Sequence, residues 1–121
     1  MKKILLGLLS IVYVVAGEEF GATGVWIVDR RKPDEPLRTG MVWTNSPADK
    51  AGITSGQFLI AVDGTNVVRK SAREAMSMVR GPAGAVVTLD IADAALSKTN
   101  KFSVKRGKAV VRNKQVVEIT D

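Results

Sequence analysis

The chain has 121 residues, which fits one domain with a single hydrophobic core. It contains no cysteine and no histidine, which excludes a disulfide framework and every mechanism that uses imidazole as a base or as a metal ligand. The formal net charge is +6, but no basic run interleaved with aromatic residues accompanies it, so nothing indicates nucleic-acid binding.

The first sixteen residues have the pattern of a secretory signal peptide. Two lysines precede an apolar run over residues 4–15, and the small residue Ala16 closes it. The run is shorter than the roughly 20 apolar residues that a membrane-spanning helix needs. We therefore predict a signal peptide over residues 1–16 that is cleaved, a periplasmic or secreted domain over residues 17–121, and no stable membrane insertion after cleavage. An uncleaved anchor is the alternative, and it would also place the domain outside the cytoplasm.

The mature chain begins with a short glycine-bracketed loop and two β-prone runs. Residues 25–28 have the β-branched and aromatic content typical of a strand. Residues 29–38 are charged and contain two prolines, which cannot donate to a sheet ladder, so we predict an exposed loop. A second strand is predicted over residues 40–44. Arg30, Arg31 and Lys32 are interpreted as solvated loop residues, with recognition of acidic ligand residues as the alternative.

A short helix is predicted over residues 47–51. Asn45 or Ser46 is suited to cap its start, and Pro47 fits the first turn, where a missing amide costs no hydrogen bond. Gly52 is suited to the left-handed conformation that ends many helices. A strand over residues 58–62 follows.

The dipeptide Asp63-Gly64 closes that strand with a hairpin turn, because both residues tolerate positive φ. A short return strand is predicted over residues 66–69. After the next helix, further strands are predicted over residues 85–91 and 102–105, joined by a polar turn, and a last hairpin over residues 110–112 and 116–119.

A longer helix begins at Ala72. Ser71 and Glu74 have the spacing of a capping box, in which each side chain satisfies a free amide at the helix start. Gly81 followed by Pro82 ends the helix. One apolar face follows the i, i+3, i+4, i+7 spacing and consists of Ala72, Ala75, Met76 and Val79.

No residues in the chain form a convincing catalytic set. Ser71 follows Lys70, but neighbouring side chains at a helix start point apart, so we interpret Ser71 as a cap and not as half of a serine–lysine pair. The acidic residues lack the further ligands that a metal needs. We expect no enzymatic activity, no metal and no cofactor.

The segment over residues 41–64 joins an apolar strand, a Ser-Pro-Ala-x-x-Ala-Gly helix, a glycine-led turn and a strand closed by Asp-Gly. This order resembles the middle of a PDZ domain. Arg-Gly-Pro-Ala-Gly at residues 80–84 and Phe-Gly-Ala-Thr-Gly-Val at residues 20–25 resemble, more narrowly, the PDZ domain of the bacterial C-terminal (tail-specific) processing proteases. The resemblance covers about residues 20–112 and does not include the domain that carries the serine and lysine of those enzymes.

The resemblance implies an α+β fold: a partly open antiparallel β-barrel or sandwich of five to seven strands, capped by one short and one longer helix. It also implies a groove between the strand at Val25 and the helix at Ala72, in which a ligand adds as an extra strand. The ligand's terminal carboxylate would bind the amides of Thr23, Gly24 and Val25. The groove would be lined by Trp26, Ile27, Ala72, Met76 and Val79.

The function implied is that of a non-catalytic peptide-binding module of the bacterial cell envelope. Its ligands would be protein C-termini or extended peptide segments, and a protease is a candidate partner. Thr23 stands where the family usually has a larger apolar residue, which predicts a wetter carboxylate pocket. The alternative is a structural or assembly subunit whose groove is filled by a neighbouring chain or by its own apolar tail, which includes Val116, Val117 and Ile119.

Overall fold

The computed structural model describes residues 18–112 and 115–120. The predicted signal peptide over residues 1–16 and the predicted turn at Asn113 and Lys114 lie outside the described residues. The elements in chain order are β1 (Glu18–Ala22), β2 (Val25–Val28), β3 (Leu37–Val42), α1 (Pro47–Lys50), β4 (Phe58–Val62), β5 (Thr65–Asn66), α2 (Ala72–Val79), β6 (Val86–Ala92), β7 (Thr99–Lys105), β8 (Gly107–Arg112) and β9 (Gln115–Thr120).

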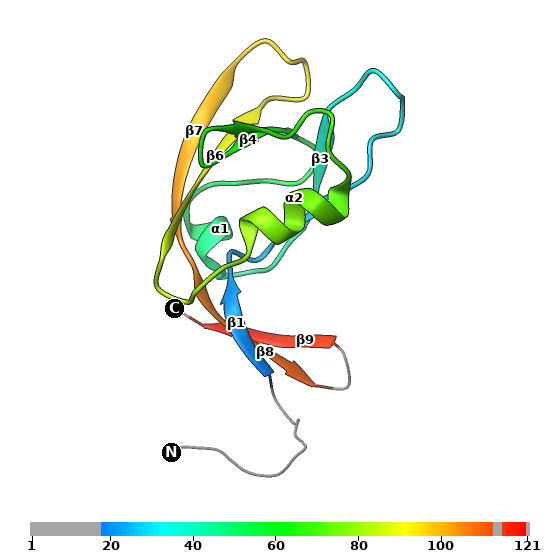
Figure 1. The fold of residues 1–121 in the computed structure, drawn as a ribbon. Helices are drawn as coiled ribbons and strands as arrows, with labels where there is room; N and C mark the ends of the chain where they lie inside the picture. Colours follow the sequence, from blue (N-terminus) through cyan, green and yellow to red (C-terminus); the bar gives the residue numbers. More distant parts are fainter. Residues whose placement is uncertain (1–17, 113–114, 121) are drawn as a thin grey trace.

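The strands form two antiparallel sheets (Figure 1). The larger sheet has the order β2-β3-β4-β6-β7, with β5 beside β4, and the smaller sheet has the order β1-β8-β9. The chain passes from the larger sheet to the smaller one at Arg106, between β7 and β8. Strand β2 therefore lies at an edge of the larger sheet, with only β3 as its strand neighbour among the described residues.

The α+β class and the antiparallel arrangement are confirmed, with one short and one longer helix. The described residues contain nine strands, more than the five to seven expected. Strand β1 is the main addition, because the sequence predicted only a loop around Gly21 and Gly24. It forms by pairing with β8, where Glu18 lies opposite Val111 and Ala22 opposite Gly107, and this partner lies far away in the sequence.

Strand β3 begins at Leu37, so the predicted loop over residues 29–38 is too long and the predicted strand start at residue 40 is wrong. Leu37 is 0% exposed and lies opposite Leu59 of β4. Burial of an apolar side chain of this size contributes about 2 kcal/mol. This gain favours a strand that begins at Leu37, directly after Pro36. Because proline has no amide, no ladder hydrogen bond is lost at position 36.

The predicted turns around α1 and β4 are confirmed in their details. Ser46, and not Asn45, caps α1, since its Oγ accepts a hydrogen bond from the Asp49 amide at 3.2 Å. Gly52 follows the helix with φ of +94°, as the left-handed exit requires. Asp63 and Gly64 have φ of +49° and +81°, the positive values of a tight hairpin turn.

One hydrophobic core lies between the larger sheet and the two helices. Its most buried large side chains come from both strands and loops, and they include Leu37, Ile53, Leu59, Leu89 and Ile91. From α2 the core receives Ala75 and Val79, while Ala72, Met76 and Met78 pack against it with part of their surface exposed. The inner face of α2 is thus the predicted apolar face, with Met78 added.

The start of α2 is held by the predicted capping box. The Ser71 Oγ accepts a hydrogen bond from the Glu74 amide at 3.1 Å, and the Ser71 amide donates to the Glu74 Oε1 at 3.1 Å. The bond from the Ser71 amide favours the charged carboxylate and is the largest cause that lowers the pKa of Glu74 below its ordinary value of 4.5, and the Ser71 side chain lowers it further. Ser71 is therefore a helix cap, as the sequence predicted.

We expect Glu74→Gln to remove a pH-dependent part of the stability. A glutamine still accepts the bond from the Ser71 amide, so the substitution removes the charge and keeps the geometry. Because the pKa of the folded carboxyl lies below 4.5, its charge stabilises the fold above that pH, and this contribution is lost as the pH falls through the lowered pKa. The urea midpoint of the variant should lie below that of the wild type at about pH 7 and converge with it in acid, once the carboxyl is protonated in both the folded and the unfolded state.

The matched control is Asp34→Asn, which removes the same charge from an exposed loop residue outside any cap. A gap between Glu74→Gln and the wild type that keeps the same size over the whole pH range would contradict the assigned role.

Candidate functional site

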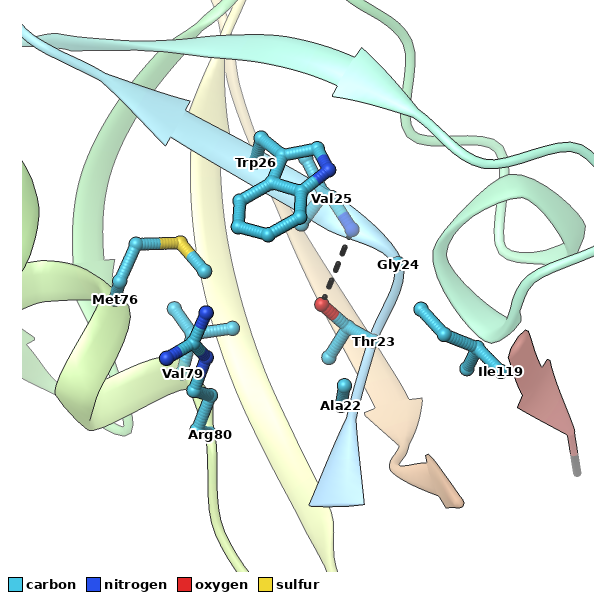
Figure 2. Close-up of a pocket in the computed structure, with 9 residues that line it drawn as sticks. All are labelled: Ala22, Thr23, Gly24, Val25, Trp26, Met76, Val79, Arg80 and Ile119. Atoms are coloured by element: carbon cyan, nitrogen blue, oxygen red, sulfur yellow. Dashed lines mark hydrogen bonds between the residues drawn. The ribbon is translucent and has the colours of Figure 1, made fainter. Parts of the chain in front are cut away.

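A pocket lies where the loop between β1 and β2 meets the end of α2 (Figure 2). It is lined by Ala22, Thr23, Gly24, Val25, Trp26, Met76, Val79, Arg80 and Ile119. The cavity among these residues has a volume of about 20 Å³. That is little more than the room for one water molecule, so the protein's own side chains nearly fill the pocket.

The loop of this pocket turns its peptide groups in one direction. The carbonyl oxygens of Thr23 and Gly24 accept hydrogen bonds from the amides of Ala48, at 2.8 Å, and Trp43, at 2.9 Å. In a trans peptide the C=O and the following N–H point in opposite directions. The amides of Gly24 and Val25 therefore point away from α1 and the end of β3.

Gly24 has no substitute at its position in the loop. Its φ is +95°, and a Cβ atom there would lie 2.3 Å from the Cβ of Ser46, the residue that caps α1. Both the backbone conformation and the lack of space require glycine. Within the described residues, the Gly24 amide has no hydrogen-bond acceptor, whereas the Val25 amide donates a long bond of 3.4 Å to the Oγ1 of Thr23 (Figure 2).

The loop is joined to the end of α2 by a pair of backbone hydrogen bonds. The Gly21 amide donates to the Gly81 carbonyl at 2.7 Å, and the Gly81 amide donates back to the Gly21 carbonyl at 3.2 Å. Arg106 supports the same junction: its Nε donates to the carbonyl of Val79 at 2.9 Å, and its Nη2 to that of Met78 at 3.4 Å. A cation there satisfies the last carbonyls of the helix and complements its dipole.

Strand β2 and helix α2 face each other across the site. The Ile27 amide donates a hydrogen bond to the Sδ of Met76 at 3.3 Å. This amide therefore points from the unpaired edge of β2 toward the helix. Val25 and Val79 are 3% and 2% exposed and form the floor between the two elements. The Trp26 ring lies on the outer side, and the Cζ of Arg80 is 5.8 Å from its centroid, within cation–π range.

The other end of α2 is also tied to β2. The Ala72 amide donates to the Oδ1 of Asp29 at 3.3 Å. Arg30 donates to three carbonyls, those of Glu35 at 3.0 Å, Val68 at 2.8 Å and Lys70 at 2.6 Å. The interpretation of Arg30 as a solvated loop residue is therefore wrong, because its guanidinium joins the loop after β2 to the segment before α2.

The structure brings most of the predicted site residues together. Thr23, Gly24, Val25, Trp26, Met76 and Val79 line the pocket, while Ile27 and Ala72 lie outside it. The sequence reasoning missed Ala22 and Arg80, and it named Ile119 only in the alternative, as part of a tail that fills the groove. The first two are chain neighbours of predicted residues, but no local signal connects Ile119 to the loop, since β9 reaches it only through the smaller sheet.

A family model of the PDZ domain matches residues 42–93, the segment from the end of β3 to the turn after β6. This chain contains a PDZ domain. The PDZ domain is a peptide-binding module, and the tied loop, the edge strand β2 and helix α2 described above are the parts that surround its pocket here.

Curated relatives include bacterial processing proteases. The carboxy-terminal-processing protease of Bartonella bacilliformis is 30% identical over 88 residues, which is 73% of this chain and 17% of that protein. A probable CtpA-like serine protease of Staphylococcus haemolyticus is 34% identical over 85 residues, 70% of this chain and 17% of that protein. The chain spans less than a fifth of the length of these relatives.

Solved structures with the same fold include two from processing proteases. The photosystem II D1 C-terminal processing protease matches with a TM-score of 0.67 and 24% identity, over 84% of this chain and 24% of that one. The PDZ domain of the carboxy-terminal protease from Vibrio cholerae matches with a TM-score of 0.64 and 18% identity, over 75% of this chain and 97% of that one. The predicted resemblance to the PDZ domains of tail-specific proteases is thus confirmed.

Residues 18–112 and 115–120 contain neither a cluster of metal ligands nor a membrane-spanning helix. In that part of the chain no three acidic side chains gather in a way that would hold a metal ion. Neither helix there has the length and apolar content needed to cross a bilayer.

We expect Gly21→Ala to destabilise the fold by about 3 kcal/mol. A Cβ at this position would lie 2.1 Å from the Gly81 carbonyl oxygen, a backbone atom that cannot move without breaking the junction. Urea unfolding measures the effect. The matched control is Gly40→Ala, where the Cβ would meet only the side chain of Val28, which is exposed and can rotate, so we expect a cost below about 1 kcal/mol. Equal costs for the two variants would show that the junction is not rigid.

Proposed function

We propose that this protein is a non-catalytic module of the bacterial cell envelope that binds C-terminal or extended segments of other proteins. The ligand adds as a strand to β2, and its terminal carboxylate binds the amides of Thr23, Gly24 and Val25. The observation that carries the proposal is the orientation of the Gly24 and Val25 amides, which point away from α1 because the carbonyls on the other side of their peptides are bonded to Ala48 and Trp43.

A carboxylate fits this loop for electrostatic reasons. Consecutive N–H groups that point the same way form a concave donor site for an anion. A hydrogen bond between an amide and a charged acceptor contributes roughly 1.5 to 3 kcal/mol. Arg80 lines the same pocket and adds positive charge near its mouth. A neutral end group would accept fewer of these bonds and would leave the amides less well satisfied.

Strand addition is supported by the free edge of β2. The strand pairs with β3 on one side, and the Ile27 amide points to the other side, toward α2. Main-chain pairing with a ligand would supply affinity, and the apolar floor at Val25 and Val79 would supply preference for an apolar last residue. The Vibrio cholerae PDZ structure is described as a complex with peptide, which supports the same mode here.

The envelope location rests on the sequence. The signal-peptide pattern over residues 1–16 and the lack of cysteine fit an exported bacterial protein. Two of the relatives are processing proteases of bacteria. We propose that the module presents or retains substrates of such a protease, or recognises the same kind of exposed chain end.

The alternative, a groove filled by the protein's own tail, has less support. The described part of the tail is β9, which pairs with β8 and not with β2. Ile119 reaches the side of the pocket, but the β2 edge carries no strand from the tail. These observations favour an edge that is available to a foreign chain.

The proposal predicts that the free carboxylate of a ligand is essential. The purified protein would be titrated with short peptides that end in an apolar residue and with the same peptides as C-terminal amides, by calorimetry or fluorescence anisotropy. We expect micromolar affinity for the acids, about −8 kcal/mol, and at least about tenfold weaker binding of the amides. Equal affinity for both forms would reject carboxylate capture. A peptide of the same composition in scrambled order controls for unspecific attraction to the positive charge.

A further inference from the structure

The free protein satisfies the edge of β2 with its own side chains. The Ile27 amide, which points toward α2, donates to the Sδ of Met76 at 3.3 Å. This is the donor that a carbonyl of an added strand would need. The Val25 amide likewise donates to the Oγ1 of Thr23, at 3.4 Å. A side chain therefore occupies the place of the expected ligand acceptor at Ile27 and at Val25, whereas the Gly24 amide has no acceptor within the described residues.

The helix that carries Met76 is held at both ends. At its start the Ala72 amide bonds to Asp29, and at its end Arg106 bonds to the carbonyls of Met78 and Val79. The pocket beside Met76 and Val79 admits little more than one water molecule. A ligand therefore needs more room than the free protein offers. A shift of the whole helix would provide that room only by breaking the hydrogen bonds at both helix ends.

We propose that Met76 is a side-chain gate. Its sulfur holds the Ile27 amide in the free protein and leaves when the carbonyl of a ligand strand takes that hydrogen bond, and the same rotation opens the pocket to the ligand's last side chain. The inference rests on the proposed function, because it describes how that ligand enters.

Methionine suits this role chemically. A thioether is a weak acceptor, so a peptide carbonyl replaces it with a gain in hydrogen-bond strength. The side chain is unbranched, with three rotatable bonds, and adopts another shape without movement of the backbone. Met76 is partly exposed and packs against the core from its edge, whereas Ala75 beside it is fully buried.

The first test needs no ligand. Leucine has a similar volume and lacks the sulfur, so Met76→Leu removes the acceptor and keeps most of the packing. We expect the amide proton resonance of Ile27 to move upfield in this variant, as it does when a hydrogen bond is lost. The control is Met78→Leu, the same substitution on the same helix outside the pocket, which should leave that resonance in place. An unchanged Ile27 resonance in Met76→Leu would overturn the gate.

The second test adds the acid peptide of the titration above. With ¹³C-labelled methionine methyl groups, the Met76 signal should move as the peptide saturates the wild type, while those of Met41 and Met78 stay. Met76→Leu should bind the peptide about two- to fivefold more tightly, because no bond to the sulfur has to be broken first. Met78→Leu should bind with the wild-type affinity.

The outcomes separate the two claims. If the peptide shifts the amides of Thr23 to Val25 but leaves the Met76 methyl signal and the affinity of Met76→Leu unchanged, the gate is wrong and the binding function stands. If neither the wild type nor Met76→Leu binds any acid peptide, although the Ile27 resonance shows that the bond to the sulfur exists, the proposed function is wrong and the gate has nothing to admit.

Discussion

The site depends on the reciprocal hydrogen bonds between Gly21 and Gly81. They fix the end of β1 against the end of α2, which places the loop at Thr23 and Gly24 beside the helix. Neither position has room for a side chain: a Cβ on Gly21 would meet the carbonyl of Gly81, and a Cβ on Gly81 would meet the guanidinium of Arg106. Gly21 and Gly81 are far apart in the sequence, but this junction requires glycine at both positions. Arg106 completes it, because its buried guanidinium satisfies the helix carbonyls at the same place.

The width of the groove is set by polar contacts at its two ends. At the far end, Asp29 bonds to the first amide of α2 and Arg30 joins the neighbouring loops through three carbonyls. The three Arg30 bonds are partly buried, and such bonds are costly to break without replacement, whereas the Asp29 bond is exposed. The apolar side chains between the ends carry no such penalty when they change rotamer. We therefore expect adaptation to the proposed ligand to be confined to side chains along the middle of the groove, of which Met76 is the most adaptable.

The parts of the fold that the sequence predicted are those whose causes act within a few residues. The capping box of Ser71 and Glu74 and the Asp63-Gly64 turn each depend on backbone groups close by, and each appears as predicted. The start of β3 at Leu37 and the existence of β1 depend instead on partners far along the chain. Burial and ladder pairing there outweigh the loop signals of proline and glycine, and no window of local sequence contains the partner.

For the site, family resemblance found the loop and the helix face, but it did not predict their state. Thr23 suggested a wetter pocket, yet it is 1% exposed and its hydroxyl accepts the Val25 amide. An edge strand has unpaired amides that can pair with another chain and cause aggregation. Proteins reduce that risk by covering the edge. Here the covers make weak hydrogen bonds: one acceptor is a thioether, and the other is a hydroxyl at the long distance of 3.4 Å. Strong acceptors would close the edge permanently, whereas weak ones satisfy the buried amides and would, in the proposed function, still give way to the carbonyl or carboxylate of a ligand.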